Sequence, residues 1–459
     1  MDYVSTRNNK KNFSFEDVFL KGLAPDGGLF VPKKIPLYSS EEMSELRNFS
    51  YKELANKIIF DYCGLRFNKN EIENLINDSY KNFSTDDVVK IIKIKNINLL
   101  ELFHGPTLAF KDIALQVIGN MYEKILKKND MNINIVVATS GDTGAAAINA
   151  LSDRKNIKIF VLHPFKKISE VQRRFMTTVD SKNVFNIAVD GNFDDCQKLV
   201  KSMFADKNFS NSIKMSGVNS INWSRIVFQI VYYFFSYFRI TKKDEKINYV
   251  VPTGNFGDIY AGYIAKKMGL PINKLVIATN KNDILKRAVN TGLYKPQKVQ
   301  HTISPSMDIQ VASNFERLVF DVYSCDSDKI LKLMKNFSEK NEIQIDKKEL
   351  AQIRESFLSE SLNDEETRLI IKRIYKNEKK LIDPHTAIGI GVAEKIKLKE
   401  NTVILSTAHP AKFSEVVFNE TGVKPELPEN LKNILTKKEK YEKLSRDLTD
   451  IQKYILSIV

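Results

Sequence analysis

A lysine stands in an unusual setting in the segment HGPTLAFKD, residues 104–112. Lys111 follows a Gly-Pro turn and the apolar triplet Leu-Ala-Phe, although a charged side chain is normally solvated. An amine held among apolar groups has a lowered pKa, so it becomes a nucleophile that can form a Schiff base with a carbonyl. Taken alone, however, the position favours a lysine that reaches solvent from the edge of a helix.

A second segment, PTGNFGD at residues 252–258, is suited to binding a phosphate group. It follows an apolar run that predicts a strand and precedes a pattern typical of a helix. Its two glycines let the backbone approach an anion, and the free N–H groups of the following helix attract negative charge. The segment has neither the Gly-Lys-Ser/Thr of a P-loop nor the spacing of a dinucleotide fingerprint. A plain turn between a strand and a helix explains it equally well.

Two further Gly-containing segments give weaker signals. TSGDTG, residues 139–144, places hydroxyl groups and an acid before a run of alanines, which suits the carboxylate of an amino acid. A capped helix packed closely on a sheet is the simpler explanation of that segment. AIGIGVA, residues 387–393, has no apolar strand before it and indicates helix packing through small residues.

Together these features favour pyridoxal phosphate (PLP) as a cofactor. PLP requires a lysine for its carbonyl, a cradle for its phosphate and a group that faces its pyridine nitrogen. Lys111 and the 252–258 segment supply the first two, and Thr407 follows a third predicted strand in TVILSTAHP. Ligands of parallel α/β sheets bind in the loops at the carboxyl ends of strands, so these loops are the expected binding region.

The order of the predicted elements indicates an α/β protein in three parts. Residues 1–90 have mainly helical patterns, including 51–64, where helical spacing ends at a glycine. Residues 91–420 alternate strands with helices, which predicts parallel sheets with right-handed crossovers. Within them, 358–381 has the pattern of charged helices, and residues 421–459 form an expected helical tail.

The charge of the chain invites a nucleic-acid interpretation, but the distribution of charge argues against it. The chain has 70 Lys and Arg and 56 Asp and Glu, a formal net charge of +14. The basic residues are spread along the sequence and mixed with acids, without a zinc-finger or RNA-binding aromatic motif. The most apolar stretch, 226–240, is too short to span a membrane and is interrupted by Gln229 and Arg239, so it predicts a buried helix. Neither nucleic acid nor membrane is therefore an expected partner.

Other functional classes lack their signatures. The first fifteen residues contain no apolar core of a signal peptide, and the three widely spaced cysteines fit a reducing cytoplasm rather than a disulfide framework. The five histidines show no metal-ligand spacing, so no metal site is expected. No GxSxG motif is present, which argues against a serine hydrolase.

Eight motifs, in order from residue 3 to residue 413, resemble those of the threonine synthase family, in its longer fungal and proteobacterial class. They are YVSTR (3–7), LAPDGGLFVP (23–32), FHGPTLAFKD (103–112), ATSGDTGAAA (138–147), VNSINWSRI (218–226), VPTGNFGDIYAGY (251–263), PSMDIQVASNFERL (305–318) and TAHPAKF (407–413). The resemblance implies a fold type II, PLP-dependent α/β enzyme of the tryptophan synthase β group. It implies two open α/β units with the cofactor between them and a mainly helical N-terminal domain.

The resemblance also implies an activity: a carbon–oxygen lyase acting on phosphate converts O-phospho-L-homoserine and water to L-threonine and phosphate. Lys111 would form the Schiff base, and Thr407 would face the pyridine nitrogen. The cofactor phosphate would be held, largely through backbone N–H groups, by Gly254, Asn255, Phe256, Gly257 and Asp258. The substrate carboxylate would be held by Ser140 and Thr143, and the substrate phosphate by Asn219, Asn222 and Arg225. Asp142 receives no role, because a carboxylate near the 3′-oxygen of the cofactor would repel it.

Two alternatives remain open from the sequence. One is a related fold type II enzyme, such as a dehydratase that makes 2-oxobutyrate, against which the 219–225 segment and the N-terminal motifs argue. The other is a PLP-carrying protein with a purely binding role, against which Lys111 and the cradle argue. A monomer or a homodimer is expected.

Overall fold

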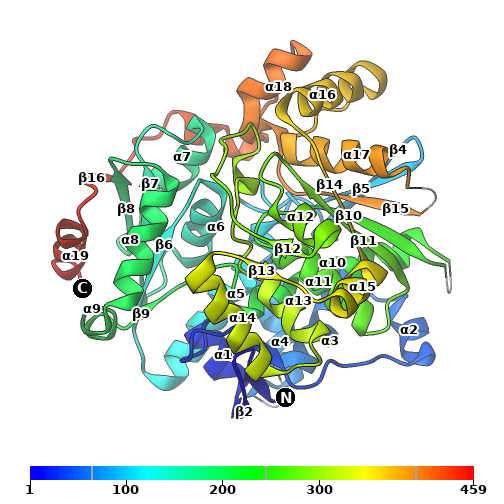
Figure 1. Cartoon of the computed structure of the whole chain (residues 1–459). Coiled ribbons are helices and arrows are strands. Elements are labelled where there is room, and N and C mark those ends of the chain that lie inside the picture. The colour runs from blue at the N-terminus through cyan, green and yellow to red at the C-terminus, as the bar shows by residue number, and fades with distance from the viewer. Residues whose placement is uncertain (64–65, 243–244, 399–400) are drawn as a thin grey trace. The chain divides into compact units, whose positions relative to one another are not determined.

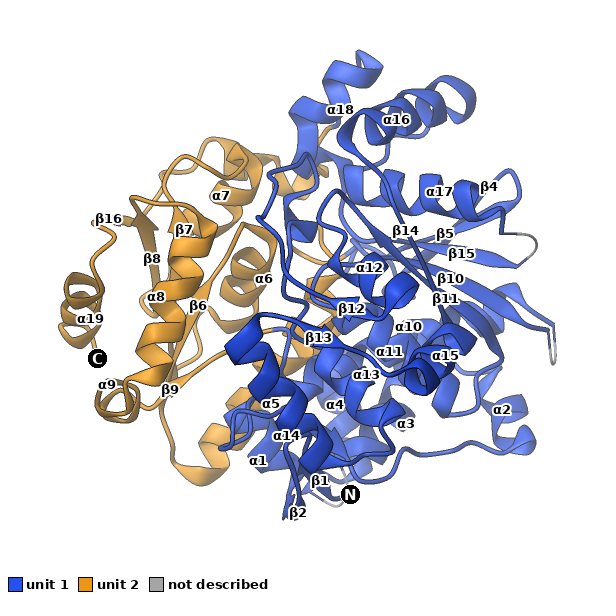
Figure 2. Cartoon of the chain, in the orientation of Figure 1, with its two compact units in different colours: residues 1–77, 83–104, 220–425 blue, residues 78–82, 105–219, 426–459 orange. Residues whose placement is uncertain are grey.

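The computed structural model describes residues 1–63, 66–242, 245–398 and 401–459 (Figure 1). The chain divides into two compact units (Figure 2). Unit 1 contains residues 1–77, 83–104 and 220–425, and unit 2 contains residues 78–82, 105–219 and 426–459. Each unit is thus assembled from segments that lie far apart in the sequence.

Unit 1 is built on a six-stranded sheet with the order β14-β11-β10-β15-β5-β4. Its strands are β4 (Lys90–Ile94), β5 (Ile97–Glu101), β10 (Ile247–Pro252), β11 (Ile272–Thr279), β14 (Phe357–Ser361) and β15 (Thr402–Ser406). Neighbours pair in parallel except β4 and β5, which are antiparallel. The parallel α/β architecture predicted for residues 91–420 is confirmed. The helical prediction for the start of 358–381 is wrong, because this part of the chain forms strand β14 and α16 (Asp364–Glu378) begins only after it. In the strand, the alternate side chains of Phe357 and Ser359 are buried.

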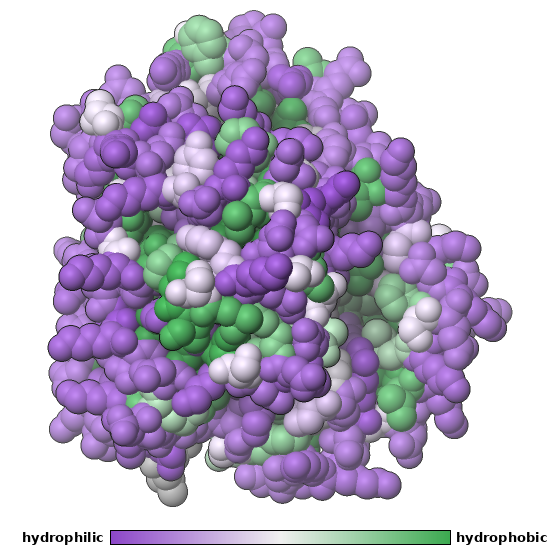
Figure 3. Space-filling view, turned by 90° about the vertical axis from the view of Figure 1, so that its left-hand side faces the viewer, coloured by the Kyte–Doolittle hydropathy of each residue, from purple (hydrophilic) through white to green (hydrophobic). Residues whose placement is uncertain are grey.

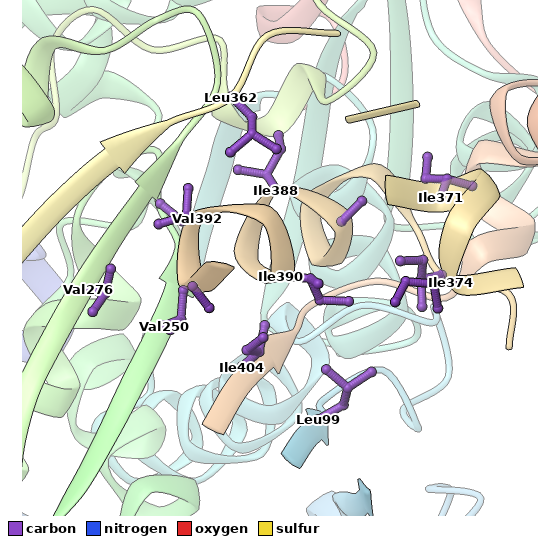
Figure 4. Packing of buried hydrophobic residues seen from close by; sticks show 14 of the residues in the cluster. Leu99, Val250, Val276, Leu362, Ile371, Ile374, Ile388, Ile390, Val392 and Ile404 are labelled. Carbon is purple, nitrogen blue, oxygen red and sulfur yellow. The ribbon is translucent and has the colours of Figure 1, made fainter. Parts of the chain in front are cut away.

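Helices cover this sheet with apolar faces. The 226–240 stretch lies inside α10 (Trp223–Ile240), where sixteen consecutive side chains from Trp223 to Phe238 are buried, which confirms the predicted buried helix. The AIGIGVA segment lies in α17 (Pro384–Ile396), as expected. A Cβ on Gly389 would lie 2.7 Å from Ile404 Cγ2, so small residues let α17 approach the sheet. Figure 4 shows the resulting core, in which each buried aliphatic side chain contributes about 1.5–3 kcal/mol.

The remaining elements of unit 1 surround this core. They are α11 (Gly257–Lys267), α12 (Ile284–Thr291), β12 (Leu293–Tyr294), η2 (Pro305–Met307), α13 (Phe315–Val322), α14 (Ser327–Lys340), β13 (Ile343–Gln344), α15 (Lys347–Ser356), η3 (Pro410–Phe413) and α18 (Ser414–Thr421). Strands β12 and β13 form a separate antiparallel pair.

The N-terminal part combines helices with a small sheet. Its helices are α1 (Phe15–Lys21), α2 (Ser40–Leu46), α3 (Tyr51–Cys63) and α4 (Lys69–Tyr80), and its strands are β1 (Tyr3–Ser5), β2 (Asn8–Phe13) and β3 (Phe30–Pro32). The helical spacing of 51–64 predicted α3 correctly, although the expected terminal Gly64 lies outside the described residues. The antiparallel sheet β2-β1-β3 was not predicted, because two of its strands are only three residues long and show no alternation.

Unit 2 is built on a five-stranded parallel sheet with the order β16-β8-β7-β6-β9. Its strands are β6 (Ile133–Ala138), β7 (Ile157–Pro164), β8 (Val184–Val189), β9 (Met215–Ser216) and β16 (Glu442–Leu444). Its helices are α5 (Lys111–Asn129), α6 (Asp142–Leu151), α7 (Glu170–Thr177), α8 (Phe193–Ala205), α9 (Lys207–Ser212), η4 (Glu429–Leu435) and α19 (Leu448–Leu456). The tail expected to be helical therefore also contains a strand, β16, which pairs with the edge of β8.

Hydrophilic side chains cover most of the face in Figure 3, with apolar side chains gathered near the middle of the view. Among the described residues, no helix has both the length and the apolar character that a membrane crossing requires.

Candidate functional site

Lys111 is the first residue of α5 in unit 2. Leu108 and Ala109 are buried, 4% and 0% exposed, and the Lys111 ammonium group lies 4.7 Å from the centre of the half-buried Phe110 ring. Only 12% of the Lys111 side chain is exposed, and its Nζ is 3.5 Å from Asp142 Oδ2. The apolar setting predicted for Lys111 is thus present, together with a carboxylate partner that was not predicted.

Asp112, the residue after Lys111, holds the loop that precedes the lysine. Asp112 is fully buried, and its carboxylate accepts hydrogen bonds from the Thr107 backbone N at 2.8 Å and from Thr107 Oγ1 at 2.6 Å. A Cβ on Gly105 would lie 2.4 Å from Asp112 Cβ, so only glycine fits there. Leu108 has a φ of 58°, a left-handed conformation that needs such support. The loop therefore presents Lys111 in a fixed position.

The TSGDTG segment connects β6 to α6 in the same unit. Thr139 Oγ1 accepts from the backbone N–H groups of Gly141 and Gly144, both at 2.9 Å, and Gly141 has a φ of 131°. This turn leaves Ser140 and Thr143 half-buried, as a ligand-binding role requires. The ion pair between Lys111 and Asp142 brings this segment next to the lysine. Asn219, the other site residue predicted in unit 2, is also half-buried.

Near Lys111 lie Gln172, which the sequence reasoning missed, and Asp142, to which it gave no role. Gln172 Nε2 donates to Asp142 Oδ1 at 2.9 Å, while Asp142 Oδ2 faces Lys111. Each carboxylate oxygen therefore has a polar partner, and the negative charge is directed at the lysine. The acid within TSGDTG could have suggested a cation nearby, but Gln172 lies thirty residues further on and carries no local signal.

The phosphate-binding segment predicted at 252–258 lies in unit 1 between β10 and α11. Phe256 has a φ of 65°, and α11 begins at Gly257, so successive backbone N–H groups are left outside the helix ladder. A left-handed residue with a side chain costs about 1–2 kcal/mol, which indicates a constrained loop. A Cβ on Gly254 would lie 2.8 Å from the Ser306 carbonyl oxygen.

Asp258 directs one oxygen of its carboxylate toward α10. Its Oδ1 accepts hydrogen bonds from Tyr232 at 2.5 Å and from Tyr233 at 2.9 Å, both on α10. A carboxylate that faced a phosphate would repel it, so this orientation leaves the loop to its N–H groups. The two tyrosines were not predicted, because they appeared only as part of an apolar helix.

Thr407 follows β15, the strand that pairs in parallel with β10. The carboxyl ends of the two strands therefore lie at the same edge of the sheet, which places Thr407 and the Gly254 loop on one side of unit 1. Thr407 is 6% exposed. Its neighbour Ser406 is fixed, since Ser406 Oγ lies 2.7 Å from Thr386 Oγ1.

Arg225 and Asn222 lie at the start of α10 in unit 1. Arg225 is 4% exposed, and burial lowers the pKa of its guanidinium group to about 10, although Tyr232 and Asp258 act in the opposite direction. A buried cation of this kind suits an anionic ligand. Asn222 caps the helix, since its side chain accepts from the Ser224 backbone N at 3.0 Å and donates to the Phe19 carbonyl oxygen at 2.9 Å. That structural role was not predicted.

The histidines form no metal centre among the described residues, where no group of three or more His, Cys, Asp and Glu side chains could hold an ion. His163 is 1% exposed at the end of β7, and burial lowers its pKa to about 4, assisted by Arg173. Burial also lowers the pKa of His409 to about 4. Both imidazoles are therefore neutral in the folded protein near neutral pH.

His163 makes stability dependent on pH. Between about pH 6.5 and pH 4 the unfolded chain binds a proton at this site that the folded protein does not, so the free energy of unfolding falls as the pH falls. The full shift corresponds to at most about 3 kcal/mol. Chemical denaturation across this range is expected to show a shallower decline for His163→Phe, whose ring can keep the contact with Tyr441. An unchanged slope would contradict a neutral buried His163.

The residues present fit PLP. Lys111 offers a shielded amine, the Gly254 loop offers backbone N–H groups at the start of α11, and Thr407 offers a neutral hydroxyl. The approach of Gly254 to Ser306 also shows that the cradle has no room for another side chain.

Gly254→Ala is accordingly expected to weaken PLP binding. Its methyl group must displace the backbone at Ser306, and overpacking of this kind costs about 1–3 kcal/mol. The dissociation constant of PLP, from absorbance titration of the apoprotein, should rise about tenfold to hundredfold. Thermal unfolding of the apoprotein serves as the control for general damage. An unaltered dissociation constant would show that the loop does not carry the cofactor.

Comparisons with known proteins identify the family of the chain. The family model described as Threonine synthase N terminus matches residues 2–80, Pyridoxal-phosphate dependent enzyme matches residues 89–408, and Threonine synthase, C-terminal matches residues 386–455. The threonine synthase of Pseudomonas aeruginosa is 41% identical, over 99% of this chain and 98% of that protein. The threonine synthase of Saccharomyces cerevisiae is also 41% identical, over 97% of this chain and 95% of that protein.

Solved structures show the same relationship. A PLP-bound threonine synthase from Brucella melitensis matches with a TM-score of 0.96 and 42% identity, over 100% of this chain and 99% of that one. The Escherichia coli threonine synthase matches with a TM-score of 0.85 and 30% identity, over the whole of both chains. The fold type II class and the PLP cofactor expected from the sequence are confirmed. The chain belongs to the threonine synthase family of PLP-dependent enzymes.

Proposed function

We propose that this protein converts O-phospho-L-homoserine and water to L-threonine and inorganic phosphate. The observation that carries the proposal is the shielded Lys111 at the start of α5, which is paired with Asp142. It occurs in a chain that relatives named threonine synthase match over nearly its whole length. A lysine at the surface normally keeps its ammonium group in water, whereas only 12% of the Lys111 side chain is exposed.

The cofactor is assigned to three elements. Lys111 would hold the cofactor through its amine, residues 254–258 would hold its phosphate through backbone N–H groups, and Thr407 would serve as the partner of its pyridine nitrogen. A neutral hydroxyl at the last position withdraws less charge from the ring than a carboxylate partner would. Bound PLP supplies an electron sink for the carbon that carries the substrate amine.

The substrate is assigned to two further segments. Ser140 and Thr143 hold the substrate carboxylate, where hydroxyl and N–H groups follow strand β6. Asn219, Asn222 and Arg225 hold the substrate phosphate, for which a buried guanidinium fork is well suited. Because Arg225 is buried and its charge is not screened by water, it favours a doubly charged phosphate over a neutral group at that position.

Lys111 then moves protons. With PLP bound, Lys111 Nζ would accept the proton from Cα, pass that proton on to the cofactor, and then accept a proton from Cβ. Asp142, held by Gln172, stabilises the ammonium form that results each time. Arg225 and Asn219 would hold the phosphate as it leaves Cγ, the Lys111 ammonium group would return its proton to Cγ, and water would then add at Cβ and release a proton.

Product analysis tests the proposal. The PLP-loaded protein is incubated with O-phospho-L-homoserine, and the products are read by proton and phosphorus NMR. Threonine and phosphate in equal amounts support the reaction. Phosphate with 2-oxobutyrate would instead assign the chain to an eliminating relative of the same fold, and no turnover would assign it another substrate.

The proposed setting is the cytoplasm, where the chain acts as a monomer or homodimer on a small molecule. Its three cysteines are free thiols, with Cys63 and Cys196 buried and Cys325 exposed. An exposed free thiol is stable in a reducing compartment and prone to oxidation elsewhere.

A further inference from the structure

The start of α13 makes an unusual set of contacts within unit 1. Asn314 occupies the position before the helix, where an asparagine normally bonds the free N–H groups of its own helix, but its side chain makes no such bond. Instead, Asn314 Nδ2 donates to the carbonyl oxygens of Asn255, at 3.0 Å, and Ser220, at 3.2 Å. This fully buried side chain thus bridges the Gly254 loop and the segment that leads into α10.

Asn314 fixes the orientation of one peptide group in the cradle. Its backbone N donates to the same Asn255 carbonyl oxygen at 3.1 Å, so that oxygen receives two hydrogen bonds from one residue. The Asn255 carbonyl and the Phe256 N–H belong to one trans peptide, in which the two groups point in opposite directions. Holding the oxygen toward Asn314 therefore turns the Phe256 N–H to the other side of the loop.

The neighbours of Asn314 hold the rest of the same turn. Ser313 Oγ donates to Asn255 Oδ1 at 3.0 Å, and the Phe315 ring meets the Phe256 ring edge to face, with centres 5.4 Å apart. Phe256 is the left-handed residue of the loop, a conformation that persists only where the surroundings determine it. Three consecutive residues thus stabilise the turn that exposes the loop N–H groups.

Arg317, in the first turn of α13, determines how Asn314 is oriented. The fully buried guanidinium group donates to Asn314 Oδ1, which leaves Nδ2 facing the two carbonyls. It also donates through Nη2 to the Ile221 carbonyl oxygen at 2.6 Å and through Nε to the Phe30 carbonyl oxygen at 3.0 Å. Arg317 therefore links strand β3 and the 220–221 backbone to the residue that orients the cradle.

We propose that Asn314 and Arg317 are positioning residues, which aim the Phe256 N–H at the cofactor phosphate and fix the backbone that leads to Asn222 and Arg225. The inference rests on the proposed role of residues 254–258 as the phosphate cradle. Neither residue is assigned a contact with substrate or cofactor. They instead connect the N-terminal motifs to the two segments assigned to the two phosphate groups.

Asn314→Asp is the sharpest test, because it keeps the shape of the side chain and the acceptor for Arg317. It replaces the Nδ2 donor with an oxygen that faces two carbonyl oxygens. The dissociation constant of PLP for the apoprotein should rise about tenfold to hundredfold. The phosphorus resonance of bound PLP should shift, while kcat at saturating PLP should fall by a smaller factor. Arg317→Met, which releases the Asn314 amide, should also raise the dissociation constant of PLP and shift the phosphorus resonance.

Arg373→Met is the matched control, since Arg373 lies exposed on α16 in an ion pair with Glu394. It should leave PLP affinity and the phosphorus resonance unchanged. If Asn314→Asp folds and binds PLP as tightly as the unaltered protein, with the same resonance, the inference is overturned and the proposed function stands. If both variants weaken PLP binding but the unaltered protein makes no threonine, the inference holds and the proposed reaction fails.

Discussion

Replacing Lys111 with alanine should lower kcat for threonine formation by about 10²–10⁴-fold, the range for loss of a general acid–base group. The variant should still bind PLP, because the Gly254 loop is intact, but dialysis should remove it. Borohydride treatment should fix PLP to Lys111 in the unaltered protein and leave the variant unlabelled, which mass spectrometry of peptides can read. The physical reason is that Lys111 is the shielded amine, placed at the start of α5 beside Asp142.

Lys127→Ala provides the control for that result. Lys127 lies exposed in the last turn of the same helix, so its loss removes one positive charge without touching the loop before Lys111. It should keep full activity and the borohydride label. Turnover of Lys111→Ala at the unaltered rate would contradict the role of this lysine.

Arg225→Lys should lower kcat/KM for O-phospho-L-homoserine by about 10–100-fold, mainly through KM, while PLP affinity changes little. Lysine keeps a positive charge near Asp258 but loses the planar fork that binds two phosphate oxygens. Charge-assisted hydrogen bonds contribute about 1.5–3 kcal/mol, which sets the size of the effect. Steady-state kinetics with the phosphorylated substrate and a separate PLP titration distinguish the two binding steps.

Arg239→Lys is the matched control on α10. Arg239 lies near the other end of the helix, exposed, and donates to the carbonyl oxygens of Arg47 and Phe49. Its replacement should change neither KM nor PLP affinity. An unchanged KM in Arg225→Lys would show that the substrate phosphate binds elsewhere.

The sequence singled out the candidate site residues whose signal is local. Lys111 stood out because a charge followed an apolar triplet, and the Gly254 loop because glycines followed a strand and preceded a helix. Parallel sheets followed from the alternation of strands with helices, since βα units permit few other arrangements. The buried helix α10 followed from its mainly apolar composition, which only a few polar residues such as Gln229 interrupt.

The contacts that orient these residues could not be predicted from the sequence. Gln172 and Asp142 are thirty residues apart, and Arg317 reaches a carbonyl group of β3 that is 287 residues away. Nothing local distinguishes an asparagine that caps its own helix, such as Asn222, from Asn314, which bonds two distant carbonyl groups. Such partners are determined by the tertiary fold, and the pattern of residue types does not show which distant residues come into contact.

Oxygen labelling tests the central claim most directly. The PLP-loaded protein is given O-phospho-L-homoserine in ¹⁸O-labelled water, and threonine and phosphate are examined by mass spectrometry. Addition of water at Cβ with loss of phosphate from Cγ predicts one labelled oxygen in the threonine hydroxyl group and none in the phosphate. Labelled phosphate with unlabelled homoserine would show hydrolysis of the phosphorus–oxygen bond, and would contradict the proposed reaction.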